Sequence, residues 1–360
     1  MVTLPTADDD SKAKPTFGSD DSKAKPTFGS AKEYEGLKKI GDGSYGIVYK
    51  AKHRRSGRMV AIKRFKEPED TDEYVRKTAL REIKLNKQLQ HTNITALLEV
   101  YRDKRLLHLV FEWVDRTLVD ALGMSGLLTK LCMWQLLRAV RYCHANGIVH
   151  RDISPKNVLV SDGGLVKLCD FGFARAVSNS AKLTEYVGQR WYRAPELLIG
   201  HEYAASIDVW ALGVTLPEVR TGRPLFPGTT EVDTVFRIVR TMGPLPEALR
   251  TSFGARPFFK GAPIEWPPTR SLTERFPGFT ADVIDLLSMA LVYDPAARAS
   301  CEALLSTSYF TDDSQMAPVR TAEEAGVPAA VEELTRQERA KQLQQKQGTS
   351  TRDSSACSIL

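Results

Sequence analysis

The spacing of apolar residues changes in character along the first half of the chain. Apolar residues at Leu37, Ile40 and 47–49 favour strands on either side of a glycine-rich turn, and residues 60–63 and 106–110 favour two further strands. Within residues 77–89 the apolar set has helical spacing. From 131 to 145 the pattern is strongly helical, and most later segments follow it. The sequence therefore predicts an α+β fold with a small β-rich lobe and a larger, mainly helical lobe.

Polar segments flank this patterned region at both ends. Residues 9–19 read DDSKAKPTFGS, and residues 20–30 repeat them unchanged. Such a composition cannot bury enough apolar surface to fold, so residues 1–33 are predicted to be a disordered tail. The repeat is either a docking element that presents Phe17 and Phe28 or a duplication without function.

The predicted domain spans residues 34–310, with a first lobe of about 34–112 and a second of about 115–310. The segment that follows, residues 311–360, is polar. It favours at most one exposed helix, over residues 328–347, with a proline in its first turn.

Composition and charge narrow the class of protein. The chain has 360 residues, of which 42% are hydrophobic and 26% charged, as expected for a globular protein with two lobes. No apolar run approaches the ~20 residues that cross a bilayer, and the first residues lack the apolar core of a secretory signal. The five cysteines are far apart, which favours a reducing, cytoplasmic location over zinc or disulfides. The net charge of +6 makes no separate case for nucleic-acid binding.

Four short motifs follow one another in a fixed order, and each suits a different task on Mg²⁺ATP. They are Gly41-Asp-Gly43-Ser-Tyr-Gly46, Val60-Ala-Ile-Lys63, His150-Arg-Asp152-Ile-Ser-Pro-Lys-Asn157 and Asp170-Phe-Gly172, with Ala194-Pro-Glu196 after them. A lone glycine-rich motif is weak evidence, but the ordered set is very unlikely by chance. On these motifs the chain is identified as a member of the eukaryotic protein kinases, which implies the bilobal kinase fold, a protein substrate, and ATP and Mg²⁺ as cofactors.

In phosphoryl transfer, the protein mainly positions the reactants and neutralises the charge of the phosphates. Glycines let the backbone approach phosphates without a side chain in the way. Lys63 supplies a charge for the inner phosphates, and Glu82 is the carboxylate expected to hold it in place; an ordinary surface pair is the alternative. The predicted ATP-binding residues are Ile40, Gly41, Gly43, Gly46, Val48, Ala61, Lys63, Glu82, Phe111, Glu112 and Val114, of which Phe111 could instead be a plain core residue.

The motif around Asp152 supplies the expected catalytic residues. Asp152 would accept the hydroxyl proton of the substrate, while Asn157 and Asp170 would hold Mg²⁺ through oxygen ligands. A solvated loop explains Asp152 alone, but it does not explain all three residues at this spacing.

Later motifs narrow the resemblance. Asp170-Phe-Gly-Phe-Ala-Arg175, Thr184-Glu-Tyr186, Arg190-Trp-Tyr-Arg-Ala-Pro-Glu196 and Pro224-Leu-Phe-Pro-Gly228 resemble the branch that holds cyclin-dependent, mitogen-activated and cyclin-dependent-kinase-like enzymes. Phe173, the Thr-Glu-Tyr triplet and Gly243-Pro-Leu-Pro246 together most resemble the cyclin-dependent-kinase-like family, over about residues 34–310. The resemblance implies serine/threonine kinase activity and, beside the cytoplasm, a location in the nucleus, cilium or flagellum. By the same resemblance, Asp208 and Arg298 are expected to be structural rather than catalytic residues. No close copy of the cyclin-binding helix is present, so no cyclin partner is expected.

The Thr184-Glu-Tyr186 triplet stands where kinases keep their activating phosphosites. A phosphate on Thr184 adds roughly two negative charges and needs cations around it. The resemblance assigns this role to Arg81, Arg151 and Arg175, and it places Arg190 to receive a phosphate on Tyr186. The activating phosphates would come from an upstream kinase or from the chain itself. The alternative interpretation is that the triplet is an exposed loop without a regulatory role.

Two positions depart from the pattern of this branch. Kinases of the branch normally carry Lys two residues after the catalytic Asp and Thr in the activation segment, where this chain has Ser154 and Gln189. The hypothesis is that Lys156 replaces the missing cation as a catalytic residue while Gln189 bridges toward Ser154. The alternatives are a merely weakened site, a nucleotide-binding pseudokinase scaffold, or an enzyme that also phosphorylates tyrosine.

The chain ends Cys357-Ser-Ile-Leu360, which fits a C-terminal prenylation motif with Leu favouring geranylgeranyl. Residue 358 is polar and no basic cluster lies just upstream. A single lipid on Cys357 would therefore give only weak, reversible membrane association.

Overall fold

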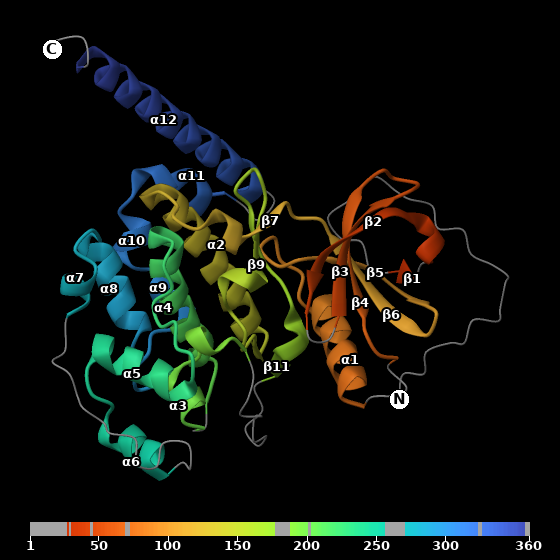
Figure 1. Ribbon diagram of the computed structural model, residues 1–360, viewed down its shortest axis with the longest axis horizontal. Helices are drawn as coiled ribbons and strands as arrows, with labels where there is room; N and C mark the ends of the chain where they lie inside the picture. Colours follow the sequence, from red (N-terminus) through yellow and green to blue (C-terminus); the bar gives the residue numbers. More distant parts are fainter. Residues whose placement is uncertain are drawn as a thin grey trace.

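The computed structural model describes residues 27–28, 30–43, 46–68, 73–176, 188–200, 203–255, 271–322 and 326–356. These residues form a β-rich lobe and a larger helical lobe, which residues 113–115 connect (Figure 1). The predicted α+β class is confirmed. The strands and helices expected at 60–63, 77–89, 106–110 and 131–145 are all present, with the helix at 77–89 beginning four residues earlier.

The small lobe is one twisted sheet with a helix against it. Its strand order is β1-β5-β6-β4-β3-β2, antiparallel except for the parallel pair of β1 and β5. Helix α1 buries Val75 and Ala79 against apolar side chains of the sheet such as Phe65 and Leu109. The elements are β1 (Thr27–Phe28), β2 (Tyr34–Asp42), β3 (Gly46–His53), β4 (Met59–Phe65), α1 (Glu73–Gln88), β5 (Leu97–Asp103) and β6 (Leu106–Glu112).

The large lobe is built around α2 and α4, whose side chains are buried almost all round. Such helices are apolar on every face because other elements cover them. Trp210 of α4 and Phe226 stack in this core, with ring centroids 6.2 Å apart. The main helices are α2 (Gly126–Ala145), α4 (Ser206–Thr221), α5 (Glu231–Met242) and α8 (Ala281–Ala290), and the shorter ones are α3 (Pro195–Leu198), α6 (Glu247–Ala255), α7 (Leu272–Arg275), α9 (Cys301–Leu305), α10 (Ser308–Thr311) and α11 (Ala317–Arg320).

Two small sheets lie where the lobes meet and fix the loops between them. One has the order β10-β9-β7, and the other pairs β8 with β11. The loop from β8 to β9 carries Asp152 and Asn157, and the loop from β10 to β11 carries Asp170. The strands are β7 (Arg116–Thr117), β8 (Ile148–Val149), β9 (Val158–Val160), β10 (Val166–Leu168) and β11 (Arg175–Ala176), with short 3-10 turns η3 (Pro155–Asn157), η4 (Phe171–Phe173) and η5 (Arg190–Tyr192).

Two expectations about the flanking segments need correction. The range assigned to a disordered tail contains β1, which pairs Thr27 with Glu99 and Phe28 with Val100, and a 3-10 turn at Ala31–Glu33. Sequence composition does not show this pairing, because it depends on the free backbone groups of the edge strand β5. Residues 1–26, with Phe17, lie outside the described part.

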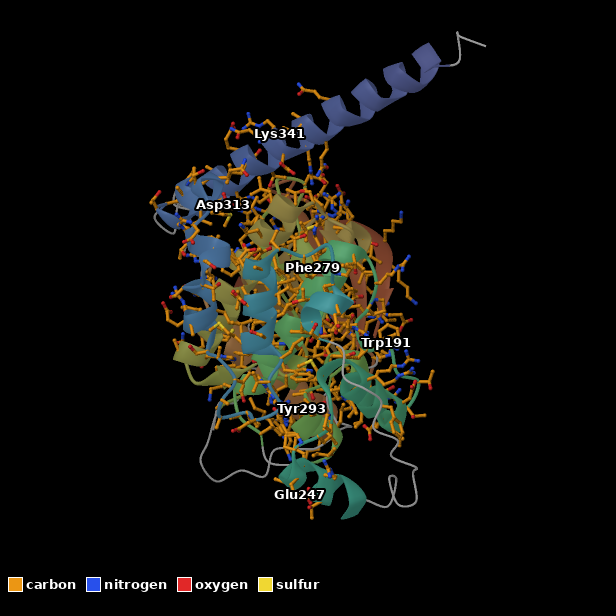
Figure 2. The ribbon with its side chains drawn as sticks, turned by 90° about the vertical axis from the view of Figure 1, so that its left-hand side faces the viewer. Trp191, Glu247, Phe279, Tyr293, Asp313 and Lys341 are labelled. Carbon is orange, nitrogen blue, oxygen red and sulfur yellow. The ribbon has the colours of Figure 1, made fainter. Side chains whose placement is uncertain are left out.

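The helix expected at 328–347 is α12 (Val327–Ala356), and it is not exposed throughout. Its first turns bury Val327, Val331 and Leu334 against the large lobe, with relative exposures of 0%, 0% and 7%. These positions recur at helical spacing, so one face of the helix is apolar over its first turns. Figure 2 shows Asp313 near the base of α12 and Lys341 on the part that projects from the body. Within the described residues, no helix is both long and apolar enough to span a bilayer.

Candidate active site

Lys63 pairs with two carboxylates, one from each lobe. Its Nζ lies 2.8 Å from Oε2 and 2.9 Å from Oε1 of Glu82, and 3.0 Å from Oδ1 of Asp170. Lys63 comes from β4, Glu82 from α1 and Asp170 from the loop after β10. Because Lys63 and Glu82 belong to the small lobe and Asp170 to the large lobe, the contact with Asp170 exists only when the lobes are assembled.

The charges in this cluster do not balance, because one ammonium faces two carboxylates. Burial raises the pKa of Glu82 to about 7, although the neighbouring Lys63 opposes the shift. Burial would lower the pKa of Lys63, but Asp170 and Glu82 raise it above its ordinary value. Burial likewise opposes ionisation of Asp170, yet Lys63 holds the pKa of Asp170 below its usual range. Asp170 therefore stays ionised, and its spare negative charge suits a divalent cation.

A cavity of about 450 Å³ opens beside this cluster, between the sheet and the large lobe. Of the residues predicted to bind ATP or metal or to act in catalysis, those that line it are Ile40, Gly41, Val48, Ala61, Lys63, Glu82, Phe111, Glu112, Val114, Lys156, Asn157 and Asp170. Its volume and its mostly apolar lining surface are typical of small-molecule sites, although many of the side chains around it are charged. The arrangement fits a nucleotide with its metal: aliphatic side chains for a base, and Lys63, Asn157 and Asp170 for charged groups.

Gly43 and Gly46 are not among the lining residues but shape the turn beside the cavity. The amide of Gly43 donates to the carbonyl of Gly46 over 2.9 Å. A Cβ at position 46 would lie 2.9 Å from the carbonyl oxygen of Arg64, so β3 and β4 can approach this closely only with glycine there.

Several lining residues were not predicted, namely Thr95, Asp115, Arg116, Thr117, Asp120, Leu159 and Cys169, together with Trp113, which was expected only as part of the linker. Cys169 directly precedes one predicted motif and Leu159 lies two residues after another, and these positions in the sequence could have indicated them. Most of the others lie in or just after the connecting segment, whereas Thr95 lies before β5, where its backbone N–H donates to the carbonyl of Leu168 over 3.0 Å. No local pattern marks them.

Asp152 lies next to the cavity, and both of its carboxylate oxygens are held. The Gln189 backbone N–H donates to Oδ1 over 2.8 Å, and Asn157 Nδ2 donates to Oδ2 over 2.6 Å. Burial raises the pKa of Asp152 above its ordinary value. The loop itself is fastened by Asp208, which accepts the backbone N–H groups of His150 and Arg151 over 2.8 Å and 2.9 Å. The carboxylate is therefore positioned rigidly and is more basic than a solvated one.

Two of the three arginines expected around a phosphate on Thr184 reach the same turn. Arg81 donates to the carbonyl of Gly172 over 2.9 Å, and Arg151 donates to that of Phe173 over 2.7 Å, so both reach η4. Arg175 lies in β11, which directly follows η4. Arg190 instead donates to the carbonyl of Thr229 over 2.8 Å. The phosphosites expected at Thr184 and Tyr186, and the prenylation site expected at Cys357, lie outside the described residues.

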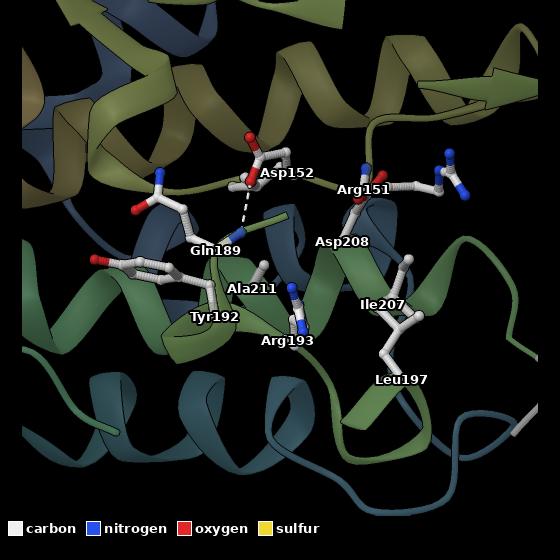
Figure 3. Close-up of a pocket in the computed structure, with 10 residues that line it drawn as sticks. Arg151, Asp152, Gln189, Tyr192, Arg193, Leu197, Ile207, Asp208 and Ala211 are labelled. Atoms are coloured by element: carbon white, nitrogen blue, oxygen red, sulfur yellow. Dashed lines mark hydrogen bonds between the residues drawn. The ribbon is translucent and has the colours of Figure 1, made fainter. Parts of the chain in front are cut away.

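The two departures from the branch pattern meet each other. Gln189 Nε2 donates a hydrogen bond to Ser154 Oγ over 2.7 Å, so the expected bridge between them is confirmed. Lys156 is exposed and lines the cavity. Figure 3 shows Gln189 beside Asp152, with their hydrogen bond dashed.

Comparison with known proteins agrees with this geometry. The family model described as the protein kinase domain matches residues 34–310. The chain is 44% identical to cyclin-dependent kinase-like 4 of Mus musculus over 78% of this chain and 83% of that protein. It is 43% identical to cyclin-dependent kinase-like 2 of Oryctolagus cuniculus over 78% of this chain and 51% of that protein. The chain belongs to the protein kinases, in the cyclin-dependent-kinase-like group.

Membership of this family carries the general chemistry of protein kinases. A protein kinase domain uses ATP and Mg²⁺ and acts on a protein substrate. In the described residues, no three His, Cys, Asp or Glu side chains gather as a metal site of their own. Asn157 and Asp170, the residues predicted to hold Mg²⁺, both line the cavity with oxygen atoms of the kind that this ion prefers.

Proposed function

We propose that this kinase is catalytically active and phosphorylates serine and threonine hydroxyls of proteins. The observation that carries the proposal is the completed set of contacts around the cavity. Lys63 is paired with Glu82 at 2.8 Å and with Asp170 at 3.0 Å, and Asp152 is fixed through both of its oxygens. Bound Mg²⁺ATP supplies the phosphoryl group. The side chains named here hold it and prepare the acceptor.

Asp152 orients the substrate hydroxyl and accepts its proton. Its carboxylate is held by Gln189 and Asn157, and burial raises its pKa, so it is a better base than a solvated aspartate. Asn157 also lines the cavity, which places the base next to the nucleotide. The positive charge for the transferred group would come from Lys63 and, in our proposal, from Lys156.

Phosphorylation of Thr184 and Tyr186 would switch the kinase on. Arg81 and Arg151 already meet at η4, from α1 and the catalytic loop respectively, which supports a cationic site for the Thr184 phosphate. Arg175 would complete that site, and Arg190 would serve the phosphate on Tyr186. The enzyme that phosphorylates these two residues would be an upstream kinase or the chain itself.

The competing function is a nucleotide-binding pseudokinase scaffold. It is favoured by Ser154, which is fully buried and leaves no cation two residues after Asp152. Measuring ADP release with a generic basic protein substrate separates the two functions. We expect the wild type to turn over and Asp152→Asn to lose at least about a hundredfold in kcat. Thr184→Ala should lower activity while leaving nucleotide binding unchanged. A wild type no faster than Asp152→Asn would establish the scaffold.

We further propose a cytoplasmic kinase that associates weakly with membranes through a prenyl group on Cys357, with the nucleus, cilium or flagellum as alternative locations. One lipid without a basic cluster gives marginal, reversible binding. Mass spectrometry of the C-terminal peptide from native cells tests whether Cys357 is prenylated. A peptide that ends in an unmodified Leu360 carboxylate would refute prenylation.

A further inference from the structure

The catalytic loop and the segment before Ala194 are joined at Gln189 by two hydrogen bonds. Its backbone N–H donates to Asp152 Oδ1 over 2.8 Å, and its side-chain Nε2 donates to Ser154 Oγ over 2.7 Å. Asp152 and Ser154 are only 9% and 0% exposed. Because both acceptors are shielded from water, these bonds are stronger and more costly to break than surface ones.

The backbone next to Gln189 is built for this contact. Gly188 has a φ of +78°, and a Cβ there would lie 2.5 Å from the carbonyl oxygen of Arg151. Only glycine lets the two segments approach this closely. Arg193 then holds the Gly188 carbonyl with Nε and Nη2 at 3.1 Å and 2.8 Å, and its Nη1 pairs with Glu231 at 2.9 Å. Gln189 is thus presented to the catalytic loop by a fixed backbone.

The pair formed by Gln189 and Ser154 is neutral. Its amide and hydroxyl fasten the catalytic loop to the segment before Ala194 without adding a charge beside Asp152. The Asp152 carboxylate therefore keeps the orientation that the Gln189 backbone N–H gives it.

We propose that Gln189 is a positioning residue for catalysis: bridged to Ser154, it fixes the backbone N–H that orients Asp152. Its effect on rate rests on the proposed kinase activity. The bridge itself does not, so it can be tested separately from turnover.

The kinetic test compares Gln189→Ala, Ser154→Ala and the double variant, with the exposed Gln337→Ala as a matched control. Each single variant should lose about tenfold in kcat with an unchanged KM for ATP. The double variant should be no worse, because both substitutions remove one interaction. Gln189→Thr with Ser154→Lys, the pair normal for the branch, should restore the rate. Losses under twofold in an active enzyme, or losses that add in the double variant, would overturn the proposal.

Hydrogen exchange provides a measurement independent of activity. We expect the backbone amide of residue 189 to exchange about tenfold faster in Ser154→Ala and Gln189→Ala than in the wild type. Its exchange rate should not change in Gln337→Ala. Unchanged exchange in Ser154→Ala overturns the bridge whether or not the wild type turns over. Faster exchange with an unaffected kcat overturns the positioning role. If the wild type is inactive but Ser154→Ala still speeds exchange at position 189, the bridge is supported. The same result refutes the kinase activity and the effect of Gln189 on rate.

Discussion

At the scale of single residues, one neutral pair occupies the position where a cation is expected. Ser154 is buried and accepts the hydrogen bond from Gln189, whereas Lys156 is exposed and lines the cavity. A cation that faces developing charge typically contributes a few kcal/mol to the transition state. Lys156 is therefore the side chain in this loop that can supply one.

We predict that Lys156→Ala lowers kcat roughly 30-fold or more, because it removes that charge. Ser154→Lys together with Gln189→Thr, in the Lys156→Ala background, should recover part of the loss. Steady-state kinetics with saturating ATP measures both, and Lys341→Ala on the projecting part of α12 is the control. If Lys156→Ala leaves kcat unchanged, the hypothesis that Lys156 replaces the missing cation is wrong.

At the scale of elements, α12 is part of the folded body over its first turns and projects beyond it afterwards. Glu338 accepts a hydrogen bond from Ser125 over 2.8 Å, and Arg339 donates to the carbonyl of Asp162 over 2.7 Å. A Cβ at Gly164 would lie 2.2 Å from Thr335 Oγ1, so the turn before β10 is closely fitted to the helix. Polar composition alone did not indicate this packing.

The same helix offers a matched pair of leucines. Leu334 is 7% exposed and Leu343 is 62% exposed. Leu334→Ala should lower the free energy of unfolding by about 2–4 kcal/mol, because it leaves a cavity in the core. Leu343→Ala should change it by less than about 0.5 kcal/mol. Urea denaturation compares them, and equal effects would mean that α12 does not dock.

At the scale of the whole molecule, a buried ion pair ties the distant parts of the large lobe together. Arg298 binds Glu196 through two contacts, at 2.8 Å and 3.1 Å, across 102 positions of the sequence. Both side chains are at most 1% exposed. The Arg298 guanidinium also lies 5.2 Å from the ring centroid of Trp210 in α4.

Removing one partner should therefore be costly. Arg298→Ala should destabilise the kinase by about 3–5 kcal/mol, since it leaves the Glu196 carboxylate buried without its cation. Arg336→Ala, which breaks an exposed pair with Glu333, should have little effect. Thermal unfolding measures both, and a mild effect of Arg298→Ala would show that the pair is not structural.

Features that depend on local order could be predicted from the chain before its structure was known. Apolar spacing indicated the two lobes, and the motifs around Lys63, Asp152 and Asp170 indicated phosphoryl transfer, because each task needs a particular residue type at a particular spacing. The hypothesis that Gln189 reaches Ser154 also came from the motifs, through two coupled departures from their pattern.

Only folding brings distant segments of the chain into contact. It placed β1 on the edge of β5, docked α12 on the large lobe, and brought Thr95 and Trp113 to the cavity. It also set the ionisation of Lys63, Glu82 and Asp170, because burial and charge neighbours come from three separate elements. Pairing, burial and pKa depend on contacts between remote parts of the chain, and no local pattern of residues records them.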